Sequence, residues 1–481
     1  TATTILIELL RAFGWAVSYY LPRRLEEGYG LSPEAAANCL EKFPVALILA
    51  VDCGSTAVEA IDWLQSKGVD VVVLDHHQVS QPPPRARALV NPQLAPPDVP
   101  SFRELCSAGL AFKLAHALLK RGRQTGLPGA EEFDLREFLE LVAMGTIADL
   151  VPLTGENRVF VSAGLERLNQ TRRPGLVALR GMAQIHHDIG VYEVGFQFSP
   201  RLNAAGRLET AEEALELLLA KTITEAEPRA RNLDARNRER QQIERSISDD
   251  VIAAVRARFK PETDYVIVEG QMLWHIGVVG IVASRVLREF YRPTIILGGE
   301  ADSWRGSGRS VEGFDLAAAL RHCDDLLLRH GGHALAAGLT IHPDKLDAFR
   351  ERINQYARQN LHPDHLKPSL RLDAEVGLGD LPMERLAELE QLKPTGQANP
   401  DVQVFARNLT LHRPPQRIGR DQQHVKFWVT DGTETCEAIW WHCARETMPD
   451  GKFDLAFAPQ INDFNGRRSV QLRVLDWRPA A

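Results

Sequence analysis

The stretch from Val69 to His77 constrains the fold of this chain more than any other. It is mainly β-branched and apolar up to Leu74, is too short for a helix, and ends abruptly in Asp75, His76 and His77. This pattern is typical of a buried strand in a parallel sheet. Because open α/β sheets gather their chemistry at the carboxyl ends of strands, the three polar residues are candidate site residues.

A second apolar run, residues 45–51, ends in Asp52. Apolar residues at helical spacing between the two runs predict a helix, with Ser55 as its N-cap and Gly68 at its end. The unit is then a βαβ crossover with parallel neighbouring strands. Asp52 should lie roughly 5 Å, one strand spacing, from the Asp75–His77 cluster, close enough to share metal ions. For the triplet alone, a hydrogen-bonded Asp–His pair without metal remains an alternative.

Length and composition limit the class of protein. A chain of 481 residues exceeds the roughly 250 to 300 that one core supports, so two or three domains are expected. The apolar runs are far shorter than the roughly 20 residues of a membrane span, and no signal peptide opens the sequence, which predicts a cytoplasmic protein. The six cysteines form no CxxC pair, which argues against a structural zinc site or a disulfide framework. With a net charge of -7, any nucleic-acid contact must come from local basic patches.

The first residues predict an amphipathic helix with no strand before it. A doubly wound sheet normally places a strand ahead of its first helix, so we expect a first strand upstream of Thr1. Residues 16–21 are predicted as a strand. The following loop, 22–30, combines Arg24 and Tyr29 with glycines, a mixture that suits a phosphate and a base, or else forms a solvated turn.

Two further segments of this region carry candidate residues. A helix over 135–144 is expected to lead into a turn that directs Asp149 toward a site. Residues 199–207 are predicted as a loop of small residues with Arg201 and Arg207. From Glu225 to Phe259 the sequence predicts a long, charged helix that bridges domains.

A second α/β unit begins near Tyr265. Residues 305–310 are predicted as a loop in which glycines let backbone N–H groups approach an anion, with Ser307, Gly308, Arg309 and Ser310 around it. A glycine-rich segment with His333 follows.

From about residue 370 the pattern changes to five short strands separated by turns, at 402–411, 425–430, 434–441, 454–461 and 470–477. This spacing fits a small Greek-key barrel of the OB type. Its aromatic and basic residues either fill the core or form a surface for a single strand. They are Trp428, Trp440, Trp441, Phe464, Trp477, Arg417, Arg420, Lys426, Arg467 and Arg468.

Taken in order, the motifs VDCG, DHH, GTIAD, SPRLNAAGR, GSGRS and GGHALAAG resemble the DHH phosphoesterase superfamily, and within it the RecJ-type single-strand-specific 5′-to-3′ exonucleases. The resemblance covers essentially the whole chain. It implies a DHH domain with a parallel sheet over 1–220, a connecting helix over 221–260, a second α/β domain of the DHHA1 type over 261–365, and an OB-like single-strand-binding barrel over 366–481. Family members also carry an Asp-x-Asp-x-x-Gly motif on a first strand. That motif is absent from the sequence, so we expect the chain as given to be inactive or impaired.

The resemblance also implies roles for individual residues. Asp52 would bridge two Mn²⁺ or Mg²⁺ ions, and His76 and Asp149 would ligate one of them. His77 would touch the scissile phosphate, and Asp75 would orient the histidines. The implied nucleic-acid contacts are Arg24, Tyr29, Arg201, Arg207, Ser307, Gly308, Arg309, Ser310 and His333.

The predicted function is a metal-dependent exonuclease that releases 5′-mononucleotides from single-stranded DNA in recombination and repair. Expected partners are a single-strand-binding protein and a RecQ-type helicase, with no membrane contact. One alternative is a phosphodiesterase for short oligonucleotides, which the barrel disfavours. Another is an inactive DHH scaffold that binds DNA or protein, which the retained acidic and histidine residues disfavour.

Overall fold

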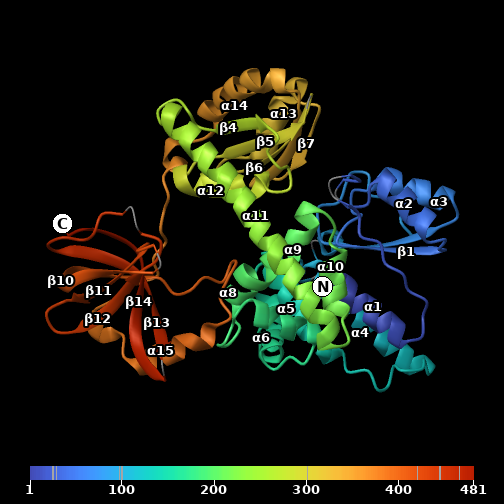
Figure 1. Cartoon of the computed structure of the whole chain (residues 1–481), viewed down its shortest axis with the longest axis horizontal. Helices are drawn as coiled ribbons and strands as arrows, with labels where there is room; N and C mark the ends of the chain where they lie inside the picture. The colour runs from blue at the N-terminus through green and yellow to red at the C-terminus, as the bar shows by residue number, and fades with distance from the viewer. Residues whose placement is uncertain are drawn as a thin grey trace. The chain divides into compact units, whose positions relative to one another are not determined.

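A computed structural model describes residues 1–23, 26–28, 30–96, 98, 101–300, 302–419, 421–443, 446–464 and 466–480. The predicted contacts Arg24 and Tyr29, and the barrel residue Arg420, lie outside these ranges, as does the side chain of Phe464. The chain forms two compact units (Figure 1). Unit 1 comprises Thr1–Asp149 and Gly164–Pro368, and unit 2 comprises Leu150–Ala163 and Ser369–Ala481.

Unit 1 begins with a three-stranded parallel sheet of order β1-β2-β3. Its strands are β1 (Leu47–Val51), β2 (Asp70–Leu74) and β3 (Ala88–Val90). The predicted crossover is confirmed, because α3 (Val58–Ser66) joins β1 to β2 and Val51 pairs with Leu74 at the carboxyl ends. Apolar residues of α2 (Pro33–Lys42), α3 and the two strands form one buried core.

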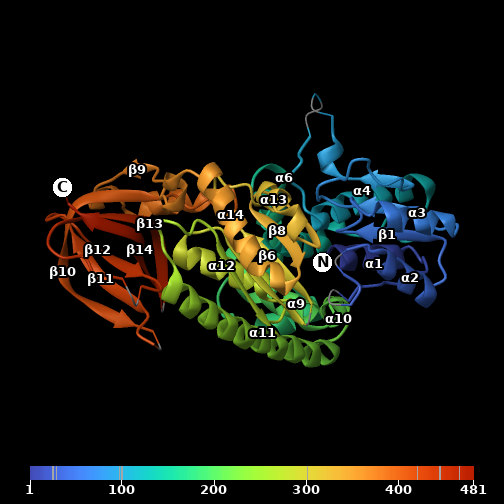
Figure 2. The same ribbon diagram turned by 90° about the horizontal axis from the view of Figure 1, so that it is seen from above.

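Helices make up the remainder of this part of unit 1. The predicted first helix is α1 (Ala2–Ala12), and the helices that follow β3 in unit 1 are α4 (Ser107–Thr125), α5 (Leu139–Ala148), α7 (Pro174–Met182), α8 (Val191–Glu193), η3 (Val194–Phe198), α9 (Ser199–Leu208) and α10 (Glu212–Leu219). Helix α6 (Gly155–Asn169) belongs to unit 2 up to Ala163 and to unit 1 from Gly164. The predicted long helix is α11 (Ile223–Arg258), seen along its length in Figure 2. It packs against α7, α9 and α10, and then against α12 (Val279–Phe290). Within the described ranges, no helix is both long and apolar enough to cross a membrane.

The second sheet of unit 1 has the order β4-β5-β6-β8-β7, with β4 and β5 parallel and the other pairs antiparallel. Its strands are β4 (Ile267–Met272), β5 (Thr294–Glu300), β6 (Ser303–Arg309), β7 (Arg329–Gly332) and β8 (Ala336–Ile341). Helices α13 (Leu316–His322) and α14 (Leu346–Asn360) contribute to its core.

Unit 2 is a barrel. Its five long strands are β10 (Val404–Ile418), β11 (His424–Thr430), β12 (Thr435–Trp440), β13 (Phe453–Phe464) and β14 (Arg467–Pro479). They run in the order β11-β12-β14-β13-β10, and a pairing of β10 with β11 closes the ring. A short strand, β9 (Ala374–Glu375), helix α15 (Met383–Leu389) and the segment Leu150–Ala163 also belong to unit 2. All five predicted strands are therefore present, and Trp440 lies in the core, which was one of the two alternatives for the aromatic residues.

Four local predictions were wrong. Residues 16–21 form no strand, and residues 305–309 belong to strand β6 rather than to a loop. Residues 145–148 and 199–207 are helical. Small residues had suggested turns in these two segments, but they serve close packing. A Cβ on Gly145 would lie 2.4 Å from the Cβ of Ala108 on α4, so the glycine lets α4 and α5 approach.

Candidate metal centre

The first two strands deliver their acidic residues to one edge of the sheet. Asp52 follows β1, and its backbone N–H donates to the carbonyl oxygen of Leu74, the last residue of β2. Its φ of 66° is in the left-handed region, which aspartate tolerates better than most residues. Asp75, His76 and His77 follow β2 directly. The parallel register therefore brings both polar clusters together, as predicted.

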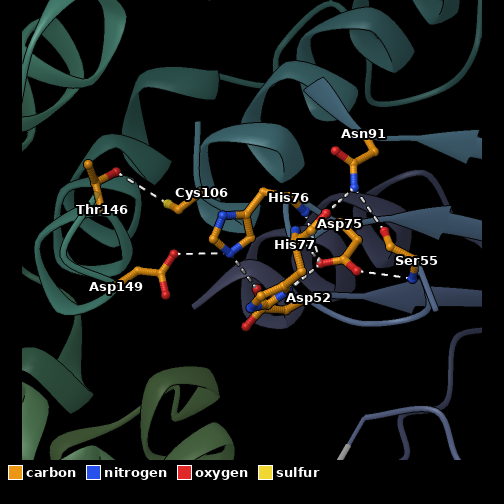
Figure 3. A network of polar contacts seen from close by, with 9 residues as sticks. All are labelled: Asp52, Ser55, Asp75, His76, His77, Asn91, Cys106, Thr146 and Asp149. Carbon is orange, nitrogen blue, oxygen red and sulfur yellow. Dashed lines mark hydrogen bonds and ion pairs between the residues drawn. The ribbon is translucent and has the colours of Figure 1, made fainter. Parts of the chain in front are cut away.

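His76 is the meeting point of two carboxylates that are far apart in the sequence. Its Nε2 lies 3.5 Å from Oδ1 of Asp52 and 3.1 Å from Oδ2 of Asp149, which caps the end of α5 (Figure 3). Since both oxygens are this close to one nitrogen, they are no more than about 7 Å apart, within reach of a shared pair of ions. His77 also belongs to the cluster, because ligand atoms of Asp52, His76 and His77 all lie within 4.8 Å of one another.

The arrangement fits a divalent cation. Nε2 of His76 is buried and makes no hydrogen bond within the described part of the chain, despite its two carboxylate neighbours. Ligand-type atoms of Asp52, His76 and Asp149 therefore converge at one point, as side chains around a cation do. Carboxylate oxygens and imidazole nitrogens are ligands that Mn²⁺ accepts, and Mg²⁺ accepts the carboxylates.

Asp75 is buried and organises the turn after β2. Its Oδ1 lies 2.7 Å from Nδ1 of His77 and accepts from the backbone N–H groups of His76 and His77, while Oδ2 accepts from the N–H of Ser55. Because a carboxylate only accepts, Nδ1 of His77 carries the proton of this hydrogen bond, and Nε2 is not engaged by Asp75. Asp75 thus fixes the turn and the ring of His77, and its role in catalysis stays a prediction.

Ser55 and Asn91 were not among the predicted site residues. Asn91 donates from Nδ2 to Oγ of Ser55 and to the carbonyl oxygen of His77, at 2.8 Å each (Figure 3). The N-cap of α3 is Ala57, so the prediction that Ser55 caps this helix was wrong. The position of Asn91 at the carboxyl end of β3 was a usable signal, because it repeats the placement of Asp52 and Asp75.

The three acids of the site differ in the direction of their pKa shifts. Burial raises the pKa of Asp149 to about 6, although His76 works in the opposite direction. Burial would also raise the pKa of Asp52 and of Asp75, but neighbouring groups hold both values below normal: His76 and Ser107 lie beside Asp52, and His77 and Ser55 hydrogen-bond to Asp75. The hydrogen bond to Asp75 raises the pKa of His77. A cation beside Asp149 would favour its ionised form.

A cavity of about 600 Å³ opens beside this cluster. Asp52 and Asp149 line it, together with Arg207. Ser199 and Asn203 also line it and were missed by the sequence analysis. Their spacing of four residues, continued by Arg207, places all three on one face of α9, a signal that the prediction of a loop concealed.

The other predicted nucleic-acid contacts lie elsewhere. Arg201 is mostly buried, with Nε 2.9 Å from Oδ1 of Asp234 on α11. Ser307, Gly308 and Arg309 lie on β6, and Ser310 follows them. His333 lies in the turn between β7 and β8. Among the described residues, none of these six lines the cavity beside Asp52.

Ser307 and Arg309 are nevertheless next to each other. Nη1 of Arg309 donates to Oγ of Ser307 at 2.9 Å and to the carbonyl oxygen of Gly308 at 2.8 Å. A Cβ added to Gly280, near the start of α12, would lie 2.9 Å from Oγ of Ser307. The predicted glycine-flanked loop is thus replaced by a strand that presents serine and arginine to the N-terminal turn of a helix.

Comparisons with known proteins agree with this architecture. Family models described as the DHH family N-terminal domain, the DHHA1 domain and the RecJ OB domain match residues 1–146, 263–359 and 372–476. The single-stranded-DNA-specific exonuclease RecJ of Dickeya dadantii is 35% identical over 98% of this chain and 84% of its own length. The chain belongs to the RecJ family. The resemblance predicted from the motifs and the fold class are therefore confirmed.

Other RecJ proteins show how much of the family architecture the chain represents. The Bacillus subtilis RecJ is 36% identical over 99% of this chain, which spans 59% of that relative's length. A crystal structure of RecJ from Thermus thermophilus in complex with Mn²⁺ matches all of this chain and 67% of its own, with 30% identity and a TM-score of 0.83. A crystal structure of the same protein with Mg²⁺ matches with a TM-score of 0.77.

Proposed function

We propose that this protein is a divalent-metal-dependent exonuclease that degrades single-stranded DNA in the 5′-to-3′ direction to 5′-mononucleotides, in recombination and repair. The observation that carries the proposal is the convergence of Asp52 and Asp149 on the buried Nε2 of His76. The names of the RecJ relatives, and the metal ions in their crystal structures, support the substrate and the cofactor.

Asp52, His76 and Asp149 would hold Mn²⁺ or Mg²⁺ ions, with Asp52 shared between two. Bound ions of this kind supply Lewis acidity that activates water and offsets charge on a phosphate. The side chains of the protein would position the substrate phosphate. Asp75 holds His77 with its protonated Nδ1 turned away, so that Nε2 can meet a non-bridging phosphate oxygen. Because the pKa of His77 is raised, a protonated imidazole is favoured there, which suits an anionic substrate.

Recognition of the 5′ end is proposed for basic and hydroxyl side chains. Arg207 lines the cavity, while Ser307 and Arg309 are oriented by each other on β6. Ser310, His333, Arg201, Arg24 and Tyr29 remain predicted contacts of the strand. A single-strand-binding protein and a RecQ-type helicase remain predicted partners, and a cytoplasmic location remains a prediction.

The test is a nuclease assay of the full-length protein on strands labelled at either end. With Mn²⁺ present, we expect 5′-mononucleotides from single strands, little product from blunt duplex, and no product after chelation of the metal. Oligonucleotides of increasing length separate this function from the short-substrate alternative. Faster cleavage of dinucleotides than of long strands would overturn the proposal in favour of that alternative, and metal-independent cleavage would refute the metal centre.

A further inference from the structure

Four residues of the segment between Leu21 and Gly30 form part of the wall of the cavity beside Asp52. Leu21, Pro22, Gly28 and Gly30 all line this cavity. A Cβ on Gly30 would lie 3.4 Å from the Cβ of Cys53, the residue that follows Asp52. A displacement of the segment would therefore change the space next to a proposed metal ligand.

Glu27 is the residue that fixes this segment. It is only 9% exposed, although it lies in a surface loop. Its carboxylate accepts hydrogen bonds from the hydroxyl of Tyr20, from Nδ2 of Asn38 at 2.6 Å and from the backbone N–H of Arg23 at 2.6 Å. One buried side chain thus connects the residue before the segment, the segment itself, and helix α2.

A second connection leaves from the backbone of the same residue. The carbonyl oxygen of Glu27 accepts a hydrogen bond from Oγ of Ser32 at 2.7 Å. Ser32 is the N-cap of α2, and its Oγ accepts a hydrogen bond from the N–H of Ala35. Ala36 of α2 is fully buried in the core shared with β1 and β2. The cavity wall is therefore tied through Glu27 to the sheet whose strands deliver Asp52 and Asp75.

The ionisation of the group agrees with this role. Burial would raise the pKa of Glu27, but the hydrogen bonds from Tyr20, Arg23 and Asn38 lower it overall. Burial and the same hydrogen bond raise the pKa of Tyr20 to about 12. At neutral pH a carboxylate thus accepts from a neutral phenol, which is the stronger, charge-assisted form of this bond.

The neighbouring acid offers a natural comparison. Glu26 belongs to the same segment and carries the same charge, but its side chain is 65% exposed and forms an ion pair with Arg23 at 3.4 Å. An exposed pair of this kind contributes little.

We propose that Glu27 is a positioning residue that holds the cavity-lining residues Leu21, Pro22, Gly28 and Gly30 in the shape that receives the end of a DNA strand, without touching the reacting atoms. This inference rests on the proposed function, since it assigns the cavity to a nucleic-acid strand. Glu27 should therefore govern binding of the strand rather than the chemical step.

The test compares Glu27→Ala with Glu26→Ala in the full-length protein. For a 5′-phosphorylated oligonucleotide we expect Glu27→Ala to raise KM about tenfold with kcat within about twofold, since a tenfold change is about 1.4 kcal/mol and lies within the range for losing buried hydrogen bonds. Glu26→Ala should leave both constants within about twofold. Tyr20→Phe removes one of the three donors and should raise KM by a smaller factor.

A small phosphodiester, bis(p-nitrophenyl) phosphate, gives the second readout. It needs the metal centre but does not extend along the cavity wall, so its hydrolysis with Mn²⁺ should be unchanged in Glu27→Ala. A parallel loss with both substrates would mean that the substitution damages the metal centre, and would overturn the proposal. An equal rise of KM in Glu26→Ala would also overturn it, by showing that charge alone matters.

Limited trypsin digestion separates this inference from the proposed function. Cleavage after Arg23 should be faster in Glu27→Ala than in the wild type, while cleavage at other sites is unchanged. If the wild type fails to degrade single strands, the proposed function fails, but faster cleavage would still support the fixing of the segment by Glu27. Equal cleavage rates would refute it whatever the nuclease assay shows.

Discussion

The carboxyl edge of the first sheet and the glycine-rich strand β6 carry equally conspicuous motifs, but the two regions are built differently. At the sheet edge, Asp52 sits in a left-handed conformation and His76 keeps a buried nitrogen without a hydrogen-bond partner. On β6, the glycines face packed side chains, because a Cβ on Gly308 would lie 2.6 Å from Leu316. A buried polar atom without a hydrogen bond indicates a functional site. Glycines within a strand indicate close packing, so on β6 only the residues between the glycines are candidates for binding.

The largest effect should follow from removing the His76 imidazole, whose Nε2 lies between Asp52 and Asp149. We expect His76→Ala to lower nuclease activity by at least about 10²- to 10³-fold, the loss typical of removing electrostatic stabilisation of a transition state. Mn²⁺ affinity, measured by calorimetry, should fall with it. The exposed His116 on α4 provides the control, and His116→Ala should change neither quantity. Normal metal affinity in His76→Ala would show that the ligands are misassigned.

A smaller effect is expected at the residue that supports the histidines. Asp75→Asn keeps the shape of the side chain but removes the charge that holds His77, and should cost about 10- to 100-fold in activity, as for other residues that orient metal-site groups. The measurement is kcat at saturating Mn²⁺, with circular dichroism to verify folding. A variant as active as the wild type would leave Asp75 with a role in folding alone.

Substitution on β6 should change substrate choice. Because Arg309 is oriented by Ser307, it should make charge-assisted hydrogen bonds to a terminal phosphate. Arg309→Ala should lower kcat/KM for 5′-phosphorylated strands by about one to two powers of ten while barely altering use of 5′-hydroxyl strands. Parallel losses with the two substrates would make the arginine structural and direct attention to Arg207.

The smallest effect on activity should come from the packing glycine. Gly308→Ala should reduce stability by about 1 to 3 kcal/mol, because the added methyl meets Leu316, and should leave the preference for 5′-phosphate intact. Gly331 on β7 is a matched control, since a Cβ there meets nothing within 4 Å. Thermal unfolding of both variants tests this. Equal melting temperatures would contradict the packing role of Gly308.

The sequence was most informative where one pattern admitted one structure. The β-branched run ending in Asp75 could only be a buried strand, and the parallel crossover then fixed the position of Asp52 beside it. Gly, Asn and Asp residues separate the barrel strands, and these turn signals made all five strands predictable. Small residues misled the prediction, because glycine and alanine occur both in turns and where helices pack closely, as Gly145 and residues 199–207 do here. The role of Asn91 depends on a contact with Ser55, 36 residues away, which no local pattern reveals.

The short segment Leu150–Ala163 limits where the chain can be divided into separate domains. It follows Asp149 directly, yet it belongs to the same compact unit as the barrel, where the N–H of Leu153 donates to the carbonyl oxygen of Gln397 and Arg158 donates to those of Gln391 and Leu392. The barrel unit therefore includes a segment that lies before α7 in the sequence, in addition to its own strands. A protein truncated after Pro368 would lose the backbone acceptors that Leu153 and Arg158 use. The segment that follows Asp149 and the C-terminal barrel should therefore be kept together in any division of the chain.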